Sequence, residues 1–366
     1  MRPLVLFLYM PSKVTYYALA KAAGVSPATV SRIVAGKTKI NPETLKRVES
    51  EAARLGLDLT KKRHEGRTIA FILSNRDVLH QFHARVLAGA EKFATEHKWQ
   101  LVFLTLHYQE NVTDAEIPLP EILGRNSLVR GVILAGANSP NLLSALRKRR
   151  MPFSILGNNV TGDWDSKACD VVYSDDIQGA HDATRYLIHG GHRNIWFLGD
   201  TRLPWFRRCG EGYQRAMHEA GLEPRLSRIH SDGRELGYLA TKSILAEGSD
   251  VTAILAGADT VAAGACSALR EAGRSIPRDV SVMGFNDSEA ALFYPALTTV
   301  REFPEELGRH LTAFVVNRIQ NPELPPQSLT IPTQLVERQS TLNLTGERGS
   351  TSGNGTSFTA GIRGSS

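Results

Sequence analysis

Cysteine is scarce in this sequence, with three in 366 residues, and long hydrophobic runs are missing. Cys169, Cys209 and Cys266 are odd in number and widely spaced, and no Cys-x-x-Cys pair exists. The sequence therefore predicts neither a disulfide framework nor a cysteine-bound zinc site, and a reducing compartment fits. No stretch approaches the roughly 20 apolar residues of a membrane span, so we expect no membrane association.

Catalytic and metal-binding signatures are also missing. The sequence contains no Walker loop and no nucleophile elbow. His80 and His83 are spaced for one helix face, as are His189 and His192, but no cysteine or paired acid accompanies either pair. We therefore expect no metal site, no cofactor and no enzyme activity.

The first ten residues, MRPLVLFLYM, superficially resemble a signal peptide. The apolar run is brief, and Pro11 and Lys13 follow it in place of a small-residue cleavage site. We expect Met10 to be the true first residue, and residues 1–13 to be an extension that precedes the first domain.

Positive charge is concentrated at the N-terminus. The formal net charge is +6, yet residues 1–68 carry 13 Lys and Arg against 5 Asp and Glu, whereas the remainder carries 30 against 32. With 42% hydrophobic residues, the chain can bury sizeable cores, and its length fits about two or three domains. A basic N-terminal segment is typical of a nucleic-acid-binding head. The alternative is a solubilising basic tail.

Two short helices joined by a glycine turn are predicted after residue 14. Thr15 can cap a first helix that ends at Ala22, and Gly24 permits a tight turn. Ser26 is a favourable N-cap and Pro27 suits the first helical position, so a second helix begins there. The alternative to a helix-turn-helix is a generic helical bundle with a basic surface.

The faces of the second helix predict how it is used. Val30 and Ile33 point inward at helical spacing, whereas Ala28, Thr29 and Arg32 point outward. The second helix of a helix-turn-helix lies in the major groove of DNA. Arg32 can then donate to guanine, while Thr29, Ser31 and Lys39 suit phosphates or base edges.

A third helix is predicted from Asn41 as N-cap and Pro42 as first residue. Its predicted buried stripe consists of Leu45, Val48, Ala52 and Leu55.

Residues 19–32 read LAKAAGVSPATVSR and residues 41–44 read NPET, which resembles the LacI/GalR family of bacterial regulators. In that family the positions of Pro27, Ala28 and Arg32 commonly meet bases. Pro27 and Ala28 have no hydrogen-bonding side chain, so base reading would depend on Arg32 and apolar contacts. With the DNA-binding domain placed at 14–56, the predicted DNA-binding residues are Thr15, Tyr17, Ser26, Pro27, Ala28, Thr29, Ser31, Arg32, Lys39, Lys61, Lys62 and Arg63.

The linker, residues 57–67, departs from the family pattern. It lacks the proline, the alanine and the wedging leucine that the family's hinge helix uses on the operator. Lys61, Lys62 and Arg63 can enter a minor groove or follow phosphates. The alternative is a flexible basic linker.

From residue 68 onward, apolar strand-like runs alternate with amphipathic helical stretches. Strands are predicted at 69–73, 101–106, 131–134, 153–156, 171–173, 195–198, 253–255 and 280–283, and helices at 82–96, 180–189 and 262–272. Near-continuous apolar strands separated by helices predict parallel sheets covered on both faces. Two such series predict two doubly wound lobes with a cleft near the carboxyl ends of the strands.

The resemblance extends over residues 14–341. The segments DDIQGA at 175–180, LIHGGHRNI at 187–195, GFND at 284–287 and PALTTV at 295–300 resemble the family's sensor, which is periplasmic-binding-protein-like and closes on an effector. The fold class is thus an all-α helix-turn-helix DNA-binding head plus an α/β sensor. The effector-binding and dimerisation domain is expected at 68–341, with lobe 1 at about 68–173 and 301–330, lobe 2 at about 174–300 and 331–341, and a disordered tail at 342–366.

The resemblance also implies where the effector binds. Asn286 can hydrogen-bond sugar hydroxyls, and Trp205 or Phe206 can stack on a sugar ring, unless these aromatics only close the lobe core. The family's usual effector-contacting arginine falls at Cys209, so Arg208 is one step out of register, and Ala258 replaces the usual asparagine. The candidate effector-binding residues are Asn75, Phe82, Asp175, Trp205, Phe206, Arg208 and Asn286.

Two other functions are compatible with the α/β architecture, an enzyme and a secreted sugar-binding protein. Neither explains a basic helix-turn-helix before the sensor. We therefore predict a cytoplasmic transcriptional regulator, a repressor, that binds double-stranded DNA at a palindromic operator as a homodimer, because one head reads only a half-site. A small-molecule effector, a carbohydrate or its derivative, is expected to modulate DNA affinity.

Overall fold

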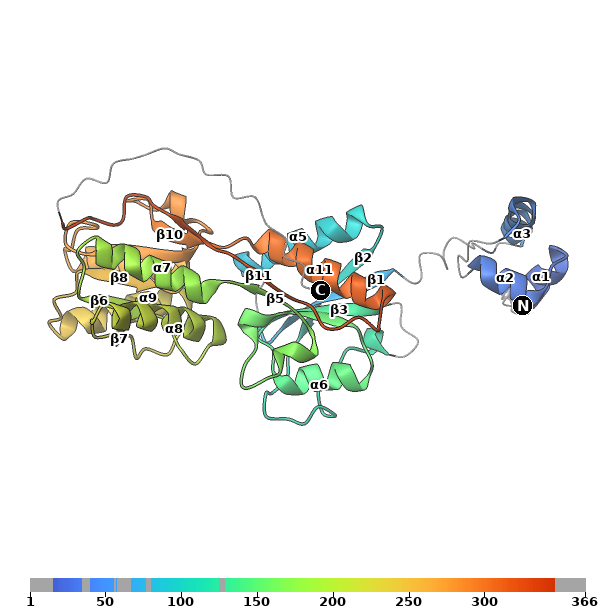
Figure 1. Cartoon of the computed structure of the whole chain (residues 1–366), viewed down its shortest axis with the longest axis horizontal. Coiled ribbons are helices and arrows are strands. Elements are labelled where there is room, and N and C mark those ends of the chain that lie inside the picture. The colour runs from blue at the N-terminus through green and yellow to red at the C-terminus, as the bar shows by residue number, and fades with distance from the viewer. Residues whose placement is uncertain are drawn as a thin grey trace, which may run out of the picture. The chain divides into compact units, whose positions relative to one another are not determined.

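The computed structural model describes residues 16–34, 40–55, 57, 67–76, 80–124 and 129–345. They form a helical head followed by α/β structure that divides into two units (Figure 1). The divisions fall between Tyr173 and Ser174, between Phe303 and Pro304, and between Leu329 and Thr330. Unit 1 therefore comprises the chain up to Tyr173 with Pro304–Leu329, and unit 2 comprises the rest.

The head contains the three predicted helices, α1 (Tyr16–Ala22), α2 (Pro27–Val34) and α3 (Pro42–Arg54). Gly24 has φ +62 with open space around it, which fits the tight turn between α1 and α2. The Asn41 side chain caps α3 by accepting from the Glu43 N–H at 2.9 Å. The buried core of the head consists of Leu19, Ala20, Ala23, Val30, Ile33, Val48 and Ala52. Leu45 and Leu55 are only partly buried and pack against this core.

Unit 1 contains a six-stranded sheet in the order β11-β5-β4-β3-β1-β2. Its strands are β1 (Thr68–Ser74), β2 (Gln100–Leu106), β3 (Val129–Gly136), β4 (Phe153–Leu156), β5 (Asp170–Ser174) and β11 (Ser328–Ile331), and its helices are α5 (Gln81–Glu96), α6 (Pro140–Lys148) and α11 (Pro304–Gln320). Gly89 of α5 faces α11 so closely that a Cβ there would lie 2.0 Å from the Glu305 carbonyl oxygen. Glycine is therefore required where these two helices cross.

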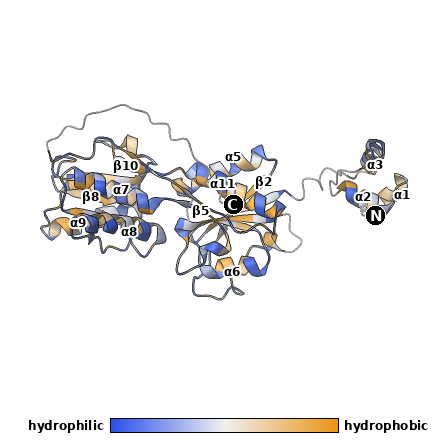
Figure 2. Ribbon diagram, viewed as in Figure 1, coloured by the Kyte–Doolittle hydropathy of each residue, from blue (hydrophilic) through white to orange (hydrophobic). Residues whose placement is uncertain are grey.

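Unit 2 contains a second six-stranded sheet, in the order β12-β10-β9-β8-β6-β7. Its strands are β6 (Ile195–Leu198), β7 (Arg225–Leu226), β8 (Ala253–Ala256), β9 (Ser281–Asn286), β10 (Thr298–Arg301) and β12 (Gln334–Val336), and its helices are α7 (Asp176–His189), α8 (Pro204–Glu219), α9 (Gly233–Ala246) and α10 (Asp259–Glu271). Neighbouring strands of this sheet run parallel, except that β12 is antiparallel to β10. Hydrophilic and hydrophobic residues alternate along helices such as α7 and α9, as expected of helices with one face on a sheet (Figure 2).

The predicted fold class is confirmed, with parallel α/β sheets following an all-helical head. The helix predicted at 180–189 begins earlier, at Asp176, because the Asp175 side chain caps it by accepting from the Gln178 N–H at 3.3 Å. Cys169, Cys209 and Cys266 are all free and buried. Within the described ranges, none of the helices combines the length and apolarity needed to cross a membrane.

The tail was predicted to begin at residue 342, and this boundary is wrong by a few residues. The Leu342 N–H donates to the Ser281 hydroxyl at 2.9 Å, and the Leu342 carbonyl accepts from the His192 ring at 3.0 Å. The Leu344 N–H donates to the Gly190 carbonyl at 2.7 Å. These hydrogen bonds hold residues 342–345 against unit 2, while residues 346–366 lie outside the described part.

Candidate functional site

Helix α2 presents one exposed face and one buried face. Val30 and Ile33 are buried in the head core, whereas Pro27, Ala28 and Arg32 are exposed. The helix begins where predicted because the Ser26 hydroxyl accepts from the Thr29 N–H at 3.1 Å. Short exposed side chains at the start of the helix allow its backbone to come close to a surface, and Arg32 extends a cation from the same side.

The remaining head candidates divide into three groups. Ser26 and Thr29 share a hydroxyl hydrogen bond of 2.9 Å, so their hydroxyls help to fix the start of α2. Tyr17 is 71% exposed on α1, and Ser31 is exposed on α2. The other predicted DNA-binding residues, Thr15, Lys39, Lys61, Lys62 and Arg63, lie outside the described residues, as does most of the linker.

An ion pair between α7 and α8 forms one side of a polar cluster in unit 2. The Asp176 side chain is 4% exposed, and the Arg208 guanidinium binds it with Nε 2.8 Å and 3.0 Å from the two carboxylate oxygens. A third contact joins Nη2 to Oδ1 at 2.7 Å. Arg208, a predicted effector ligand, is therefore committed to a buried carboxylate within its own unit, and Asp176 is a partner that sequence reasoning missed.

A buried glutamate forms the other side of this cluster. Glu302, directly after β10, is 6% exposed and accepts from the Asn286 side-chain amide at 2.5 Å. Burial raises the pKa of the Glu302 carboxyl to about 7, against hydrogen bonds from Ser174 and Asn286 that lower it, and the negative charge of Asp176 adds to the rise. Asn286, another predicted ligand, has φ +99, and its side chain is held by this glutamate.

Asp259 is a further buried carboxylate of unit 2, just after β8. Asp259, the first residue of α10, accepts from the Thr299 hydroxyl at 2.7 Å and from the Ser288 N–H at 2.8 Å. Burial raises the pKa of Asp259 to about 6. Asp200, which follows β6, and Glu302, which follows β10, are buried acids like Asp259, so the buried acids of unit 2 gather near the carboxyl ends of its strands. This is the edge where doubly wound sheets bind ligands.

The two aromatic candidates differ in burial. Phe206 is 1% exposed and packs in the core of unit 2, where a Cβ on Gly257 would lie 2.6 Å from its ring. The Phe206 side chain therefore closes the core of unit 2, which is one of the two roles that the sequence leaves open for it. Trp205 is partly buried beside it, with ring centroids 6.0 Å apart, and retains an accessible surface. Cys209 is 3% exposed and contributes to the core.

The candidates in unit 1 lie at the carboxyl end of β1. Asn75 has φ +50, and its side chain accepts from the Tyr108 N–H at 2.9 Å, which joins the ends of β1 and β2. Phe82 is partly buried and meets the His83 ring edge-on at 5.4 Å. Burial lowers the pKa of His83 to about 3, and its ring contacts the Asn159 amide at 3.1 Å. His83 and Asn159 are polar residues of this edge that sequence reasoning did not select.

Family comparisons match both parts of the chain. Residues 15–56 match the family described as bacterial regulatory proteins, lacI family, and residues 184–341 match the periplasmic binding protein-like domain. The HTH-type transcriptional regulator DegA of Bacillus subtilis (strain 168) is 30% identical over 352 residues, which cover 90% of this chain and 98% of DegA.

Solved structures agree with this likeness. The transcriptional regulator CelR in complex with cellobiose is 27% identical with a TM-score of 0.66, and the match covers 90% of this chain and 100% of that one. A LacI family transcriptional regulator from Enterococcus faecium with bound ribose is 25% identical with a TM-score of 0.64, over 76% and 99% of the two chains. The similarity therefore includes both the head and the sensor.

Proposed function

This chain belongs to the lacI family of bacterial regulatory proteins. We propose that it is a repressor that binds a palindromic operator, and that binding of a carbohydrate changes its affinity for that operator. Its relatives are transcriptional regulators and not enzymes. The observation that supports specific DNA reading is α2, where Arg32 is exposed while Val30 and Ile33 are buried in the head core. A protein with this role acts in the cytoplasm, where the DNA is.

Arg32→Ala tests this proposal. We expect a loss of about 1–3 kcal/mol in binding to the preferred operator duplex, confined to one base-pair position in each half-site, because a bidentate arginine discriminates guanine. The measurement is fluorescence anisotropy with duplexes carrying single base-pair changes.

Lys21→Ala, at an exposed position on α1, is the matched control. A loss that is uniform over all duplexes would make Arg32 a phosphate contact, and an unchanged affinity would remove it from the interface.

The effector proposal depends on unit 2. Carboxylate and amide groups such as those of Glu302 and Asn286 are suited to hydroxyl-rich ligands, and Trp205 offers an apolar ring surface. The similar regulators solved with cellobiose and with ribose support a carbohydrate. Thermal unfolding with a panel of sugars, cellobiose and ribose included, should show one that raises Tm, because a ligand specific for the native state stabilises it. If no carbohydrate shifts Tm, the proposed ligand class is wrong.

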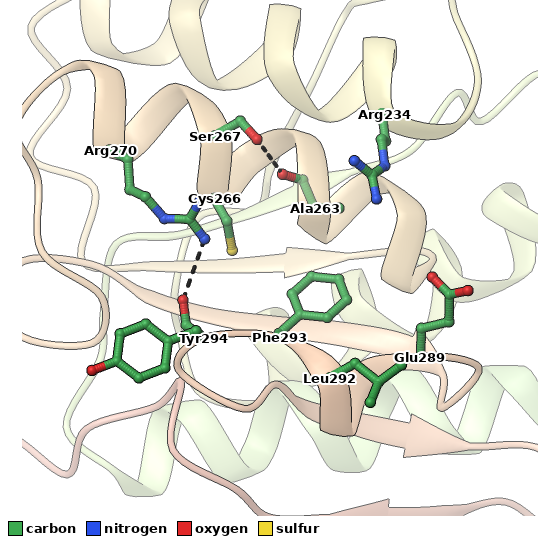
Figure 3. A pocket seen from close by; sticks show the side chains of 9 residues that line it. All are labelled: Arg234, Ala263, Cys266, Ser267, Arg270, Glu289, Leu292, Phe293 and Tyr294. Carbon is green, nitrogen blue, oxygen red and sulfur yellow. Dashed lines mark hydrogen bonds between the residues drawn. The ribbon is translucent and has the colours of Figure 1, made fainter.

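The homodimer proposal is supported by an exposed apolar surface on unit 2. Leu292 and Tyr294 are 84% and 89% exposed, and together with Cys266, Arg270 and Phe293 they help to line a pocket of about 310 Å³ (Figure 3). The Arg270 guanidinium donates to the Tyr294 carbonyl at 3.3 Å and holds this segment in place. Large apolar side chains next to a pocket mark association sites, and a two-fold dimer uses the same patch on both copies.

We expect Leu292→Asp to convert the dimer to a monomer, because the interface would then bury an unpaired charge. Analytical ultracentrifugation of the full chain measures the result. Leu239→Asp, at another exposed leucine of unit 2, is the control and should leave the dimer intact. A dimer that persists in Leu292→Asp would place the interface elsewhere.

A further inference from the structure

Unit 1 has a basic groove of about 1160 Å³ that the effector proposal does not use. Its lining comes from the starts of β3 and β4 and from the ends of α6 and α11. None of the described lining residues is acidic. Five of them are cationic, namely Arg130, Lys148, Arg149, Arg150 and Arg318. We call this surface the basic groove.

Two of the five cations are neutralised by neighbouring acids. Arg318 binds the buried Asp170 with Nη2 2.8 Å from Oδ1, and Lys148 lies 2.6 Å from Asp114. Arg318 also donates to the carbonyl oxygens of Pro322 and Pro325, so its role is to join α11 to the segment that follows it.

Three arginines therefore provide the charge of the basic groove. Arg130, Arg149 and Arg150 are all exposed, and among the described residues no ion pair joins any of them to an acid. Arg150 has φ +55, a conformation that directs the chain from the end of α6 towards β4. Three adjacent guanidinium groups without acidic partners favour a polyanion over a neutral ligand.

The basic groove lies at the end of the sheet where the chain arrives from the head. Thr68, the first residue of β1, pairs with Val129, which directly precedes Arg130. The parallel strands β3 and β4 start at this same edge, and the Pro152 carbonyl accepts from the Val132 N–H at 2.9 Å. The effector candidates Asn75 and Phe82 follow the opposite, carboxyl end of β1.

The length of the linker limits how far bound DNA can be from this edge. The head helices end at Arg54, and β1 starts at Thr68. At about 3.3–3.6 Å per extended residue, the intervening chain spans at most roughly 50 Å. A duplex held by the head therefore stays within reach of the surface beside Thr68.

From the charge and the position of the groove, we propose that Arg130, Arg149 and Arg150 bind the phosphate backbone of the DNA that flanks the operator. This inference rests on the proposed DNA-binding function of the head. The interaction is independent of sequence, because guanidinium groups on phosphates neutralise charge and release counterions without reading bases. It adds affinity and leaves the choice of operator to α2.

The test compares two duplexes, one trimmed to the preferred operator and one extended by about one helical turn on each side. The wild-type full chain should bind the extended duplex about tenfold more tightly at near-physiological salt, with a steeper dependence of log K on log salt. In the triple variant R130A/R149A/R150A this advantage should disappear, and the slope should fall by about 1 for each phosphate that the variant no longer binds. Affinity for the trimmed duplex should not change.

Two further variants separate charge from folding. R130K/R149K/R150K keeps the charges and should retain most of the advantage, whereas R228A/R274A/R278A removes three exposed arginines from unit 2 and should retain all of it. Equal binding of both duplexes by the wild type, or an unchanged slope in the triple alanine variant, would overturn the proposal and leave α2 as the reader of the operator. Absence of operator binding by the wild type would overturn the proposed function itself.

Discussion

We expect Arg208→Ala to lower the free energy of unfolding by about 3–5 kcal/mol, because it leaves the buried Asp176 carboxylate without its cation. The pair has three contacts of 2.7–3.0 Å, and its acid is 4% exposed, so solvent cannot replace the guanidinium. This loss should exceed the loss from breaking any exposed ion pair of the chain, because an exposed ion pair contributes only about 0–1 kcal/mol. Urea denaturation of the full chain measures it.

Two variants accompany this measurement. Arg207→Ala removes an exposed arginine from the preceding position of α8 and should change stability by less than about 0.5 kcal/mol. The double variant R208M/D176N removes both charges and should recover most of the loss, because it is the unpaired buried charge that destabilises. If Arg208→Ala is as stable as Arg207→Ala, the ion pair does not organise unit 2.

The second large effect concerns pH. At about pH 8, Glu302→Gln should raise the free energy of unfolding by about 3 kcal/mol, because each pKa unit corresponds to about 1.4 kcal/mol. Burial raises the pKa of Glu302 from 4.5 to about 7, so the folded state holds a proton that the unfolded state has released. The contribution of Glu302 to the free energy of unfolding is therefore present in full below about pH 4.5 and is lost as the pH rises through about 7.

Measuring the free energy of unfolding at several pH values across this range distinguishes the contribution of Glu302 from that of Asp259. In Glu302→Gln, the free energy of unfolding should no longer decline between about pH 6 and 7. A decline at lower pH should remain, because burial raises the pKa of Asp259 to about 6. Glu211→Gln, an exposed glutamate on α8, should behave as the wild type. A decline that survives unchanged in Glu302→Gln would show that this carboxyl does not titrate in the folded protein.

The parts of the fold that local sequence signals specify were predictable. Gly24, Ser26-Pro27 and Asn41-Pro42 are turn and capping residues whose chemistry acts within a few residues, so the head helices were placed closely. Apolar runs located the buried strands in the same way. The tail boundary was missed because Leu342 and Leu344 are held by hydrogen bonds to Ser281 and Gly190, which are distant in sequence.

The side-chain geometry of the site depends on such distant contacts. Arg208 is a candidate because it lies one step from the family's effector-contacting position, but its partner Asp176 is 32 residues away and the ion pair appears only in the folded unit. Phe206 is a candidate by its aromatic ring, yet glycines after two strands, Gly199 and Gly257, let the core close over it. Glu302 follows a strand like many other acids, and only its burial distinguishes it.

In the proposed function, the exposed face of α2 reads a specific operator as part of a symmetric dimer. The most direct test is selection from random duplex DNA by the purified full chain at near-physiological salt. We predict recovery of a palindrome with two related half-sites, one for each head. Recovery of unrelated sequences, with binding that is uniformly weakened by salt, would contradict the claim, because it would reduce the head to a phosphate-binding module.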